Sequence, residues 1–140
     1  MRSAASLLEE SFEVMKKKGW DTIYVLVDCH GTIFKSSYSL ENEKFEYFPY
    51  AKEALRLLSS LSFIKLIFWT SSYEAEIEKY LKKMAEDGIV FSQVNGNILE
   101  SSTKLQDFSK KFYFNVGIDD RFGFDASNDW RELYGFLLEL

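Results

Sequence analysis

Three acidic residues stand out because they follow two apolar stretches. Asp28 ends the run over residues 23–27, and Asp119 and Asp120 follow a second run that ends at Ile118. Apolar runs of this length are typical of strands that are buried on both faces of a parallel sheet. Ligands bind at the carboxyl ends of such strands, so the carboxylates placed there are candidates for chemistry.

Three further polar side chains are expected at the same edge. Thr70 and Ser71 follow the apolar stretch 63–69, and His30 lies two residues after Asp28. Oxygen ligands from separate strands suit a hard divalent cation such as Mg2+, which binds carboxylates and usually keeps several waters. The same edge could hold a phosphate group through that ion.

Apolar stretches alternate with helical patterns along the whole chain. Strands are predicted at 23–28, 63–69, 89–91 and 112–118, and helices at 4–18, 49–60, 71–86 and about 128–140. This alternation favours parallel strands joined by right-handed crossovers. We therefore expect a single α/β domain over residues 1–140, a three-layer α/β/α sandwich with a Rossmann-like parallel sheet.

Capping-box spacings mark the expected start of two helices. Ser6 is followed by Glu9, and Ser71 by Glu74, which is the separation at which the two side chains satisfy backbone donors of the first turn. The first of these helices, residues 4–18, is amphipathic. We expect it to pack on the sheet, and dimerisation or covering of the site is the alternative.

The residues around Asp28 resemble the first motif of a known superfamily. Residues 28–32, DCHGT, are similar to the Asp-x-Asp-Gly-Thr motif of the haloacid dehalogenase (HAD) superfamily, with His30 in place of the second aspartate and a turn at Gly31 and Thr32. Residues 117–121, GIDDR, resemble its fourth motif in the Asp-Asp form. Members are mostly phosphatases and phosphotransferases that act through a phosphoaspartate.

The resemblance implies two catalytic residues. Asp28 would be the nucleophile that attacks phosphorus. His30 would be the general acid that protonates the leaving group and later the base that activates water. Imidazole can act both as the acid and as the base, because an unperturbed histidine titrates at about pH 6.5.

Phosphate and metal binding are also implied by the resemblance. Thr70, with Ser71 beside it, has the position of the second motif, whose hydroxyl binds a phosphoryl oxygen. Lys111 has the position of the third-motif lysine, and Lys104 and Lys110 are alternatives. The Mg2+ ligands would be Asp28, the backbone carbonyl of His30, Asp119 and Asp120.

No cap domain fits between these motifs. Polar and aromatic residues alternate over residues 34–48, and residues 41–43 are the expected tip. This pattern predicts a β-hairpin flap beside Asp28. The flap and one helix occupy the chain up to Thr70, and few residues remain before Lys111. The resemblance thus implies an open site for a phosphate on a nucleotide, a nucleic-acid end or another large molecule, or a site closed by another subunit in a homo-oligomer.

Composition narrows the function classes. The chain has 140 residues, 46% of them hydrophobic, which is enough for one core. A net charge of -5 gives nucleic acid only weak support as a partner. The single cysteine, Cys29, excludes an intrachain disulfide. Without a signal peptide or the roughly 20 apolar residues of a membrane span, we expect a soluble, cytoplasmic protein with no membrane partner.

The predicted function is therefore a Mg2+-dependent phosphatase that acts through Asp28. A domain that keeps the fold and the metal site but turns over nothing, for binding or regulation, is the first alternative. A purely structural α/β domain is the second. A thiol nucleophile made from Cys29 and His30 is a third, although neighbouring residues of an extended chain point to opposite sides.

Overall fold

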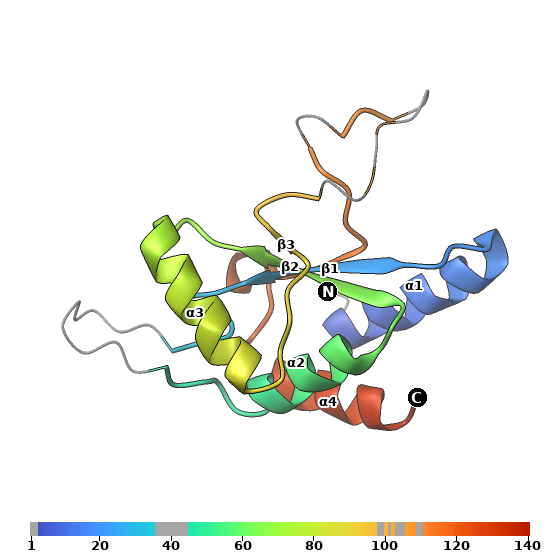
Figure 1. The fold of residues 1–140 in the computed structure, drawn as a ribbon. Coiled ribbons are helices and arrows are strands. Elements are labelled where there is room, and N and C mark those ends of the chain that lie inside the picture. Colours follow the sequence, from blue (N-terminus) through green and yellow to red (C-terminus); the bar gives the residue numbers. More distant parts are fainter. Residues whose placement is uncertain (1–2, 36–44, 98–99, 101, 103–105, 109–110) are drawn as a thin grey trace.

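The computed structural model describes residues 3–35, 45–97, 100, 102, 106–108 and 111–140. The order of its elements along the chain can be followed in Figure 1. They are α1 (Ala4–Lys18), β1 (Ile23–Asp28), α2 (Ala51–Ser60), β2 (Ile64–Trp69), α3 (Glu74–Glu86), β3 (Gln93–Val94), β4 (Val116–Ile118), the 3-10 helix η1 (Asp120–Phe122) and α4 (Asp129–Leu138).

The four strands form one parallel sheet in the order β3-β2-β1-β4. β1 pairs with β2 along its whole length, from Ile23 opposite Ile64 to Asp28 opposite Trp69. From β1 the chain moves outward to β2 and β3, and it then returns to β4 on the other side of β1. The strand order therefore reverses between β1 and β4, where sheets of this kind bind ligands at the carboxyl ends of the strands.

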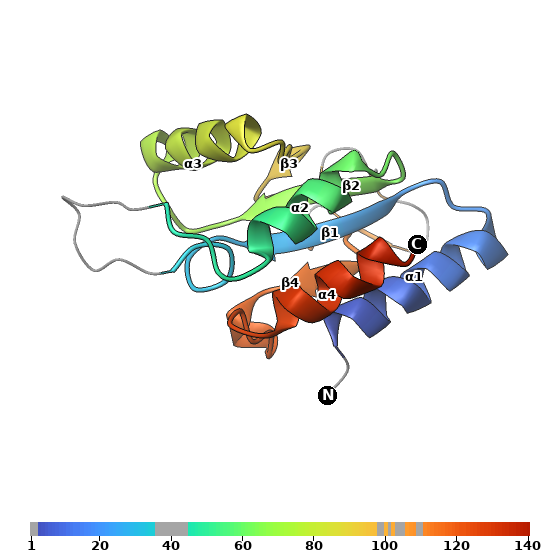
Figure 2. The ribbon, with the colours of Figure 1, turned by 90° about the horizontal axis from the view of Figure 1, so that it is seen from below.

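The helices and the sheet share one main hydrophobic core. Buried residues of α1, α2, α3 and α4 pack with alternate residues of β1 such as Val25 and Val27, and α1, α2 and α4 lie on the same side of the sheet (Figures 1 and 2). The opposite face, which carries Tyr24 and Ile67, is covered by the aromatic segment 112–114. The predicted α/β class is confirmed: a four-stranded parallel sheet flanked by four helices, consistent with a Rossmann-like three-layer fold.

The two capping-box predictions are wrong. α1 begins after Ser3, whose hydroxyl accepts the N–H of Ser6 at 3.1 Å, so Ser6 lies inside the first turn. α3 begins after Tyr73, and Ser71 lies outside it. The backbone N–H of Ser72 instead donates to the Thr70 hydroxyl at 3.1 Å, a local turn that delays the helix. As predicted, α1 packs against the sheet, and its buried residues Ala5, Leu8 and Phe12 belong to the main hydrophobic core.

The third strand lies later in the chain than predicted. It covers Gln93–Val94 instead of residues 89–91. The N–H of Ile89 donates to the Met84 carbonyl at the end of α3, and the N–H of Val90 donates to the Ser59 hydroxyl, so neither can join the sheet there. β4 is also shorter than predicted, because residues 112–114 cover the sheet before the strand begins.

At the base of the predicted flap, its two arms pair in antiparallel fashion. Phe34 and Tyr47 form an antiparallel bridge, and the N–H of Lys35 donates to the carbonyl of Glu46 at 2.9 Å. The predicted tip at 41–43 lies outside the described residues. Within the described part of the chain, no helix combines the length and the apolar character needed to cross a lipid bilayer.

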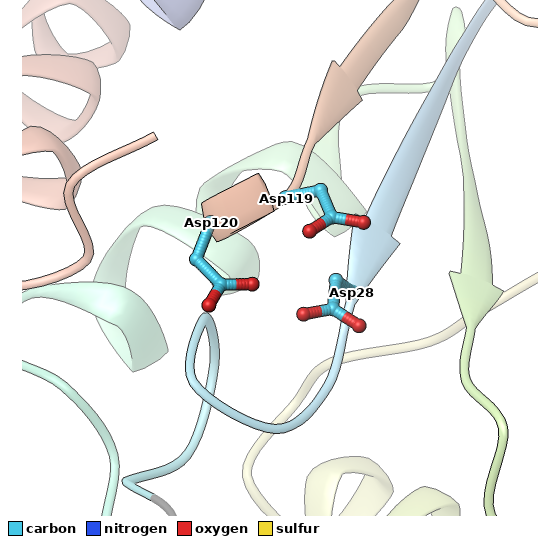
Figure 3. Close-up of side chains that lie close together, drawn as sticks. All are labelled: Asp28, Asp119 and Asp120. Atoms are coloured by element: carbon cyan, nitrogen blue, oxygen red, sulfur yellow. The ribbon is translucent and has the colours of Figure 1, made fainter. Parts of the chain in front are cut away.

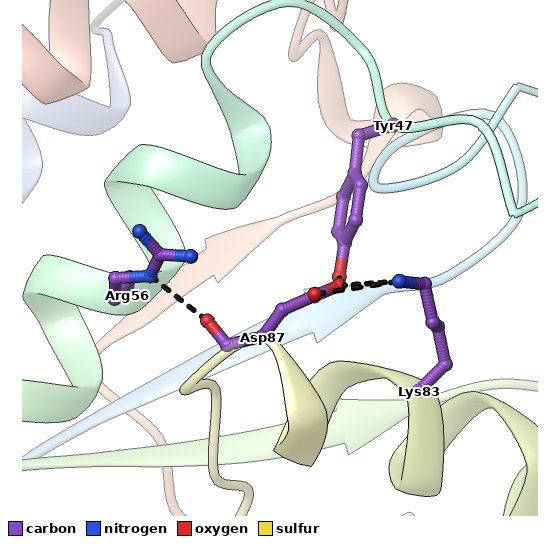
Figure 4. Close-up of polar contacts among 4 residues, drawn as sticks. All are labelled: Tyr47, Arg56, Lys83 and Asp87. Carbon is purple, nitrogen blue, oxygen red and sulfur yellow. Dashed lines mark hydrogen bonds and ion pairs between the residues drawn. The ribbon is translucent and has the colours of Figure 1, made fainter.

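Asp87 joins the flap base to two helices (Figure 4). Its carboxylate accepts the Tyr47 hydroxyl at 2.6 Å and lies 3.2 Å from the ammonium of Lys83, while Arg56 of α2 donates to its carbonyl at 2.8 Å. Burial by itself would raise the pKa of Asp87. The hydrogen bonds from Tyr47 and Lys83 outweigh it, and the pKa is lowered.

Tyr47→Phe tests this connection. A hydrogen bond to a charged group is worth about 1.5–3 kcal/mol, so we expect the variant to lose about that much unfolding free energy at neutral pH. Because the folded pKa of Asp87 is lowered, its contribution is present above the unfolded carboxyl pKa and is lost as pH falls through the folded pKa. Urea unfolding should show a smaller loss at about pH 3 than at about pH 7.

The matched control is Tyr134→Phe, which removes a hydroxyl from a tyrosine of α4 whose ring packs on Tyr50. Its effect on unfolding should not follow the titration of Asp87. An equal loss for Tyr47→Phe at both pH values would contradict the role given to this carboxylate.

Candidate functional site

Three carboxylates converge at the carboxyl edge of the sheet (Figure 3). Asp28 ends β1, Asp119 follows β4, and Asp120 opens η1; each offers one oxygen, and these oxygens all lie within 4.8 Å of one another. Oxygen donors this close together are the ligands that Mg2+ uses. The structure thus brings together the three acidic residues that the sequence assigns to a metal site.

The carboxylate cluster is electrostatically unfavourable by itself. Burial is the main cause that raises the pKa of Asp28 to about 6; the hydrogen bond from Thr32 opposes the rise, and the charges of Asp119 and Asp120 add to it. The pKa of Asp119 is also raised, first by burial and then by Asp120, against the opposing N–H of Arg121. A divalent cation would offset this repulsion, so the donor set and the charge of the cluster both fit Mg2+.

Thr32 connects the loops that carry the carboxylates. Its hydroxyl donates to Oδ2 of Asp28 at 2.9 Å and accepts the N–H of Asp120 at 3.1 Å. Its carbonyl accepts the indole N–H of Trp130, from α4, at 2.7 Å, and both residues are fully buried. The sequence assigns Thr32 only to a turn, whereas its hydroxyl also orients the carboxylate of Asp28.

Gly31 permits the close approach of the loop to Asp120. Its φ of 78° lies in the left-handed region, and a Cβ there would lie 3.1 Å from Oδ2 of Asp120. Any other residue at this position would strain the backbone and would bring its Cβ against the carboxylate of Asp120. Glycine is therefore needed for the geometry of the metal ligands as well as for the turn.

His30 lies in the same pocket but turns toward α3. Its Nε2 is 3.1 Å from the hydroxyl of Ser72, which also accepts the hydroxyl of Thr70 at 3.0 Å. The imidazole meets the ring of Tyr80 edge-on, with 5.2 Å between centroids. These contacts hold the ring from two sides. Ser72 was not singled out from the sequence, because its role depends on a residue that lies far away along the chain.

The side chain of Cys29 does not line the pocket. Its side chain is fully buried in the main core, and burial raises the pKa of its thiol. A reactive thiol needs access and a lowered pKa. The thiol alternative is therefore disfavoured.

The site residues line one open pocket of about 600 Å³. Its lining consists of Asp28, His30, Gly31, Trp69, Thr70, Ser71, Asn95, Asp119, Asp120 and Arg121. The predicted phosphate-binding pair Thr70 and Ser71 thus lies with the carboxylates. Asn95 fixes Thr70 by accepting its N–H and donating to its carbonyl, both at 2.8 Å.

The structure does not bring Lys111 to this pocket. Lys111 lines a separate cavity of about 390 Å³ with residues 106–108 and 112–114. Spacing along the chain placed it at the site, but the residues just before β4 cover the face of the sheet instead. Arg121, which the sequence did not suggest as a phosphate ligand, is the permanently cationic side chain among the described lining residues. Lys104 and Lys110 lie outside the described residues.

Comparison with a solved structure supports the fold. No protein-family model matches the chain, and no curated protein shows significant similarity to it. It is similar to the solved structure of a conserved protein from Bacteroides thetaiotaomicron, with 28% sequence identity and a TM-score of 0.62. The match covers 84% of this chain and 91% of the other, so the α/β architecture is shared over most of both proteins.

Asp28→Asn tests the electrostatics of the cluster. Because the folded pKa of Asp28 is raised to about 6, its protonated form favours folding below the unfolded carboxyl pKa, and this advantage is lost as pH rises through about 6. In EDTA, the variant should therefore unfold at a higher temperature than the wild type at about pH 7.5. The difference should shrink toward about pH 4.

Glu78→Gln, an exposed carboxylate in the middle of α3, is the control with the same change in charge and should show no such trend. Mg2+ should raise the unfolding temperature of the wild type by mass action, and less so that of Asp28→Asn. A variant that is less stable than the wild type at both pH values, with the same response to Mg2+, would contradict this account of the cluster.

Proposed function

We propose that the protein is a Mg2+-dependent phosphatase of the haloacid dehalogenase type that acts through a phosphoaspartate on Asp28. The observation that carries the proposal is the convergence of Asp28, Asp119 and Asp120 beside Thr70 at the reversal of strand order. Residues 28–32 and 117–121 supply this group in the order of the superfamily motifs.

In the first step, a carboxylate oxygen of Asp28 attacks phosphorus, and the bond from phosphorus to the ester oxygen breaks. The leaving oxygen takes a proton from cationic His30. Thr32 supports this step, because its hydrogen bond to Oδ2 fixes the rotation of the Asp28 carboxylate. The product is an acyl phosphate on Asp28.

In the second step, water attacks the phosphorus of the acyl phosphate, and neutral His30 takes the proton of that water. The bond from phosphorus to the Asp28 oxygen breaks, which releases inorganic phosphate and restores the carboxylate. Each cycle therefore returns both residues to their starting protonation states.

Charge balance at the site also favours a bound cation. Among the described lining residues, three carboxylates, those of Asp28, Asp119 and Asp120, share the pocket with one guanidinium, that of Arg121, so the pocket is negative where it would receive a phosphate. The three carboxylates and the backbone carbonyl of His30 would hold Mg2+, which when bound would offset the charge of the phosphoryl oxygens. Arg121 would supply the positive charge that the sequence assigns to Lys111.

A domain that binds metal and phosphate without turnover is the second candidate function. The contacts of His30 favour it, because the imidazole is engaged by Ser72 and Tyr80 on the α3 side of the pocket. General acid-base catalysis is worth about 10²- to 10⁴-fold in rate, so a histidine that stays there would leave a slow enzyme.

Hydrolysis of a generic aryl phosphate tests the proposal. The wild type should release phosphate with Mg2+ and not with EDTA, and Asp28→Asn should have no activity because it lacks the nucleophile. His30→Asp restores the usual residue of the first motif and should keep or raise the rate. His30→Ala should lower it by about 10²- to 10⁴-fold, and Glu78→Gln should match the wild type.

Beryllofluoride, which mimics a phosphoryl group on aspartate, separates the two candidates. An inactive wild type that binds beryllofluoride with Mg2+, together with an active His30→Asp, would establish the binding domain. If the wild type is inactive and beryllofluoride does not bind, the phosphoaspartate proposal fails.

A further inference from the structure

Trp69 lies beside the proposed nucleophile. It is the last residue of β2 and pairs in register with Asp28, the last residue of β1. Register partners on neighbouring strands project from the same face of a sheet, and the strands lie about 5 Å apart. The indole therefore forms the wall of the pocket next to Asp28 on the β2 side.

The indole is supported on one side and open on another. Its centroid lies 5.6 Å from the ring of Phe112, which lies 6.1 Å from the ring of Phe114. Trp69 nevertheless keeps 37% of its surface exposed. Among the described lining residues it is the large apolar side chain, since the others are polar, charged or glycine.

The other two tryptophans have different surroundings. Trp130 is fully buried and donates its N–H to Thr32. Trp20 is 39% exposed but has the ammonium of Lys18 over its ring, at 5.1 Å from the centroid. Of the three tryptophans, Trp69 is thus the one that is partly exposed, contacts another aromatic ring and lines the pocket.

The pocket has room for more than a phosphate group. Its volume of about 600 Å³ lies within the range of sites that take a whole small molecule. Asp119 and Asp120 occupy the β4 side, and Thr70, the proposed phosphate ligand, directly follows Trp69 in the chain. A phosphate held between Asp28 and Thr70 therefore lies next to Trp69, whose indole is the apolar surface that the rest of the ester can contact.

We propose that Trp69 stacks on a planar aromatic ring of the substrate, so that the preferred substrates are phosphate monoesters that carry such a ring close to phosphorus. This inference rests on the proposed function, because it places the leaving group by the position of Asp28 and Thr70. An aryl phosphate carries the ring directly on the ester oxygen, and a nucleoside monophosphate carries it one sugar away. Both present the same flat π face to the indole.

Binding to the Asp28→Asn protein, in which no phosphoaspartate can form, tests the inference without turnover. Calorimetry with Mg2+ compares phenyl phosphate and adenosine monophosphate with ribose 5-phosphate and inorganic phosphate, which have no ring. Stacking on one base is worth about 5- to 150-fold in affinity. We therefore expect both aromatic esters to bind at least about fivefold more tightly than ribose 5-phosphate.

Trp69→Leu in the same background should remove most of this preference, and Trp69→Phe, which keeps a ring, should retain part of it. The unfolding midpoint of each variant checks that the fold is intact. Whichever aromatic ester loses more affinity in Trp69→Leu identifies the source of the ring: phenyl phosphate for an aryl ester, adenosine monophosphate for a nucleotide.

Two outcomes would overturn the inference, and they are distinguishable. If inorganic phosphate binds but the aromatic esters bind no more tightly than ribose 5-phosphate, or if Trp69→Leu weakens all esters equally, the stacking role fails and the phosphatase proposal stands. If neither phosphate nor any ester binds in the presence of Mg2+, to this variant or to the wild type, both the stacking role and the proposed function fail.

Discussion

Repulsion among three carboxylates is the constraint on which the architecture of this site depends. Asp28, Asp119 and Asp120 come from two strand ends and would separate if their loops were free. Thr32 opposes this, since one hydroxyl binds the side chain of Asp28 and the backbone of Asp120. Trp130 holds Thr32 in turn from the buried side of α4. The core thereby fixes the cluster although burial and the neighbouring charges raise the pKa of Asp28 and of Asp119, and a bound cation would offset that repulsion.

The alternation of side chains along β1 separates structure from chemistry. Val25 and Val27 point to the face covered by the helices, and their burial stabilises the sheet. Tyr24 and Leu26 point to the other face, toward the aromatic segment 112–114. Asp28 continues this second series at the strand end, so its neighbours are the end of β2 and the loop after β4. Its position at the pocket follows from the register of a buried strand.

Much of the fold and the core of the site can be predicted from the sequence. Apolar runs that end in polar residues identify β1 and β2, and the carboxyl ends of parallel strands share one edge of a sheet. That rule brings Asp28, Thr70 and Asp119 together although they are far apart in the chain. The parallel sheet and the acidic cluster therefore follow from local patterns and one general rule of topology.

The remaining features depend on contacts that no local pattern records. The role of Ser72 depends on His30, and the hydrogen bond of Val90 to Ser59 prevents a strand at the apolar run 89–91. Lys111 has suitable spacing but lines another cavity, because the chain before β4 covers a sheet face. Spacing in the sequence predicts the order of the motifs. The positions of Ser72, Val90 and Lys111 depend instead on how distant parts of the chain pack together.

The most direct measurement of the central claim is the chemical identification of the covalent intermediate. The wild type is mixed with Mg2+ and an aryl phosphate, quenched during turnover and reduced with borohydride, which converts an aspartyl phosphate into homoserine. Peptide mass spectrometry should find homoserine at position 28, and it should be absent when Mg2+ or the ester is omitted. Steady release of phosphate with no modification of Asp28, or with homoserine at another aspartate, would contradict the role given to Asp28.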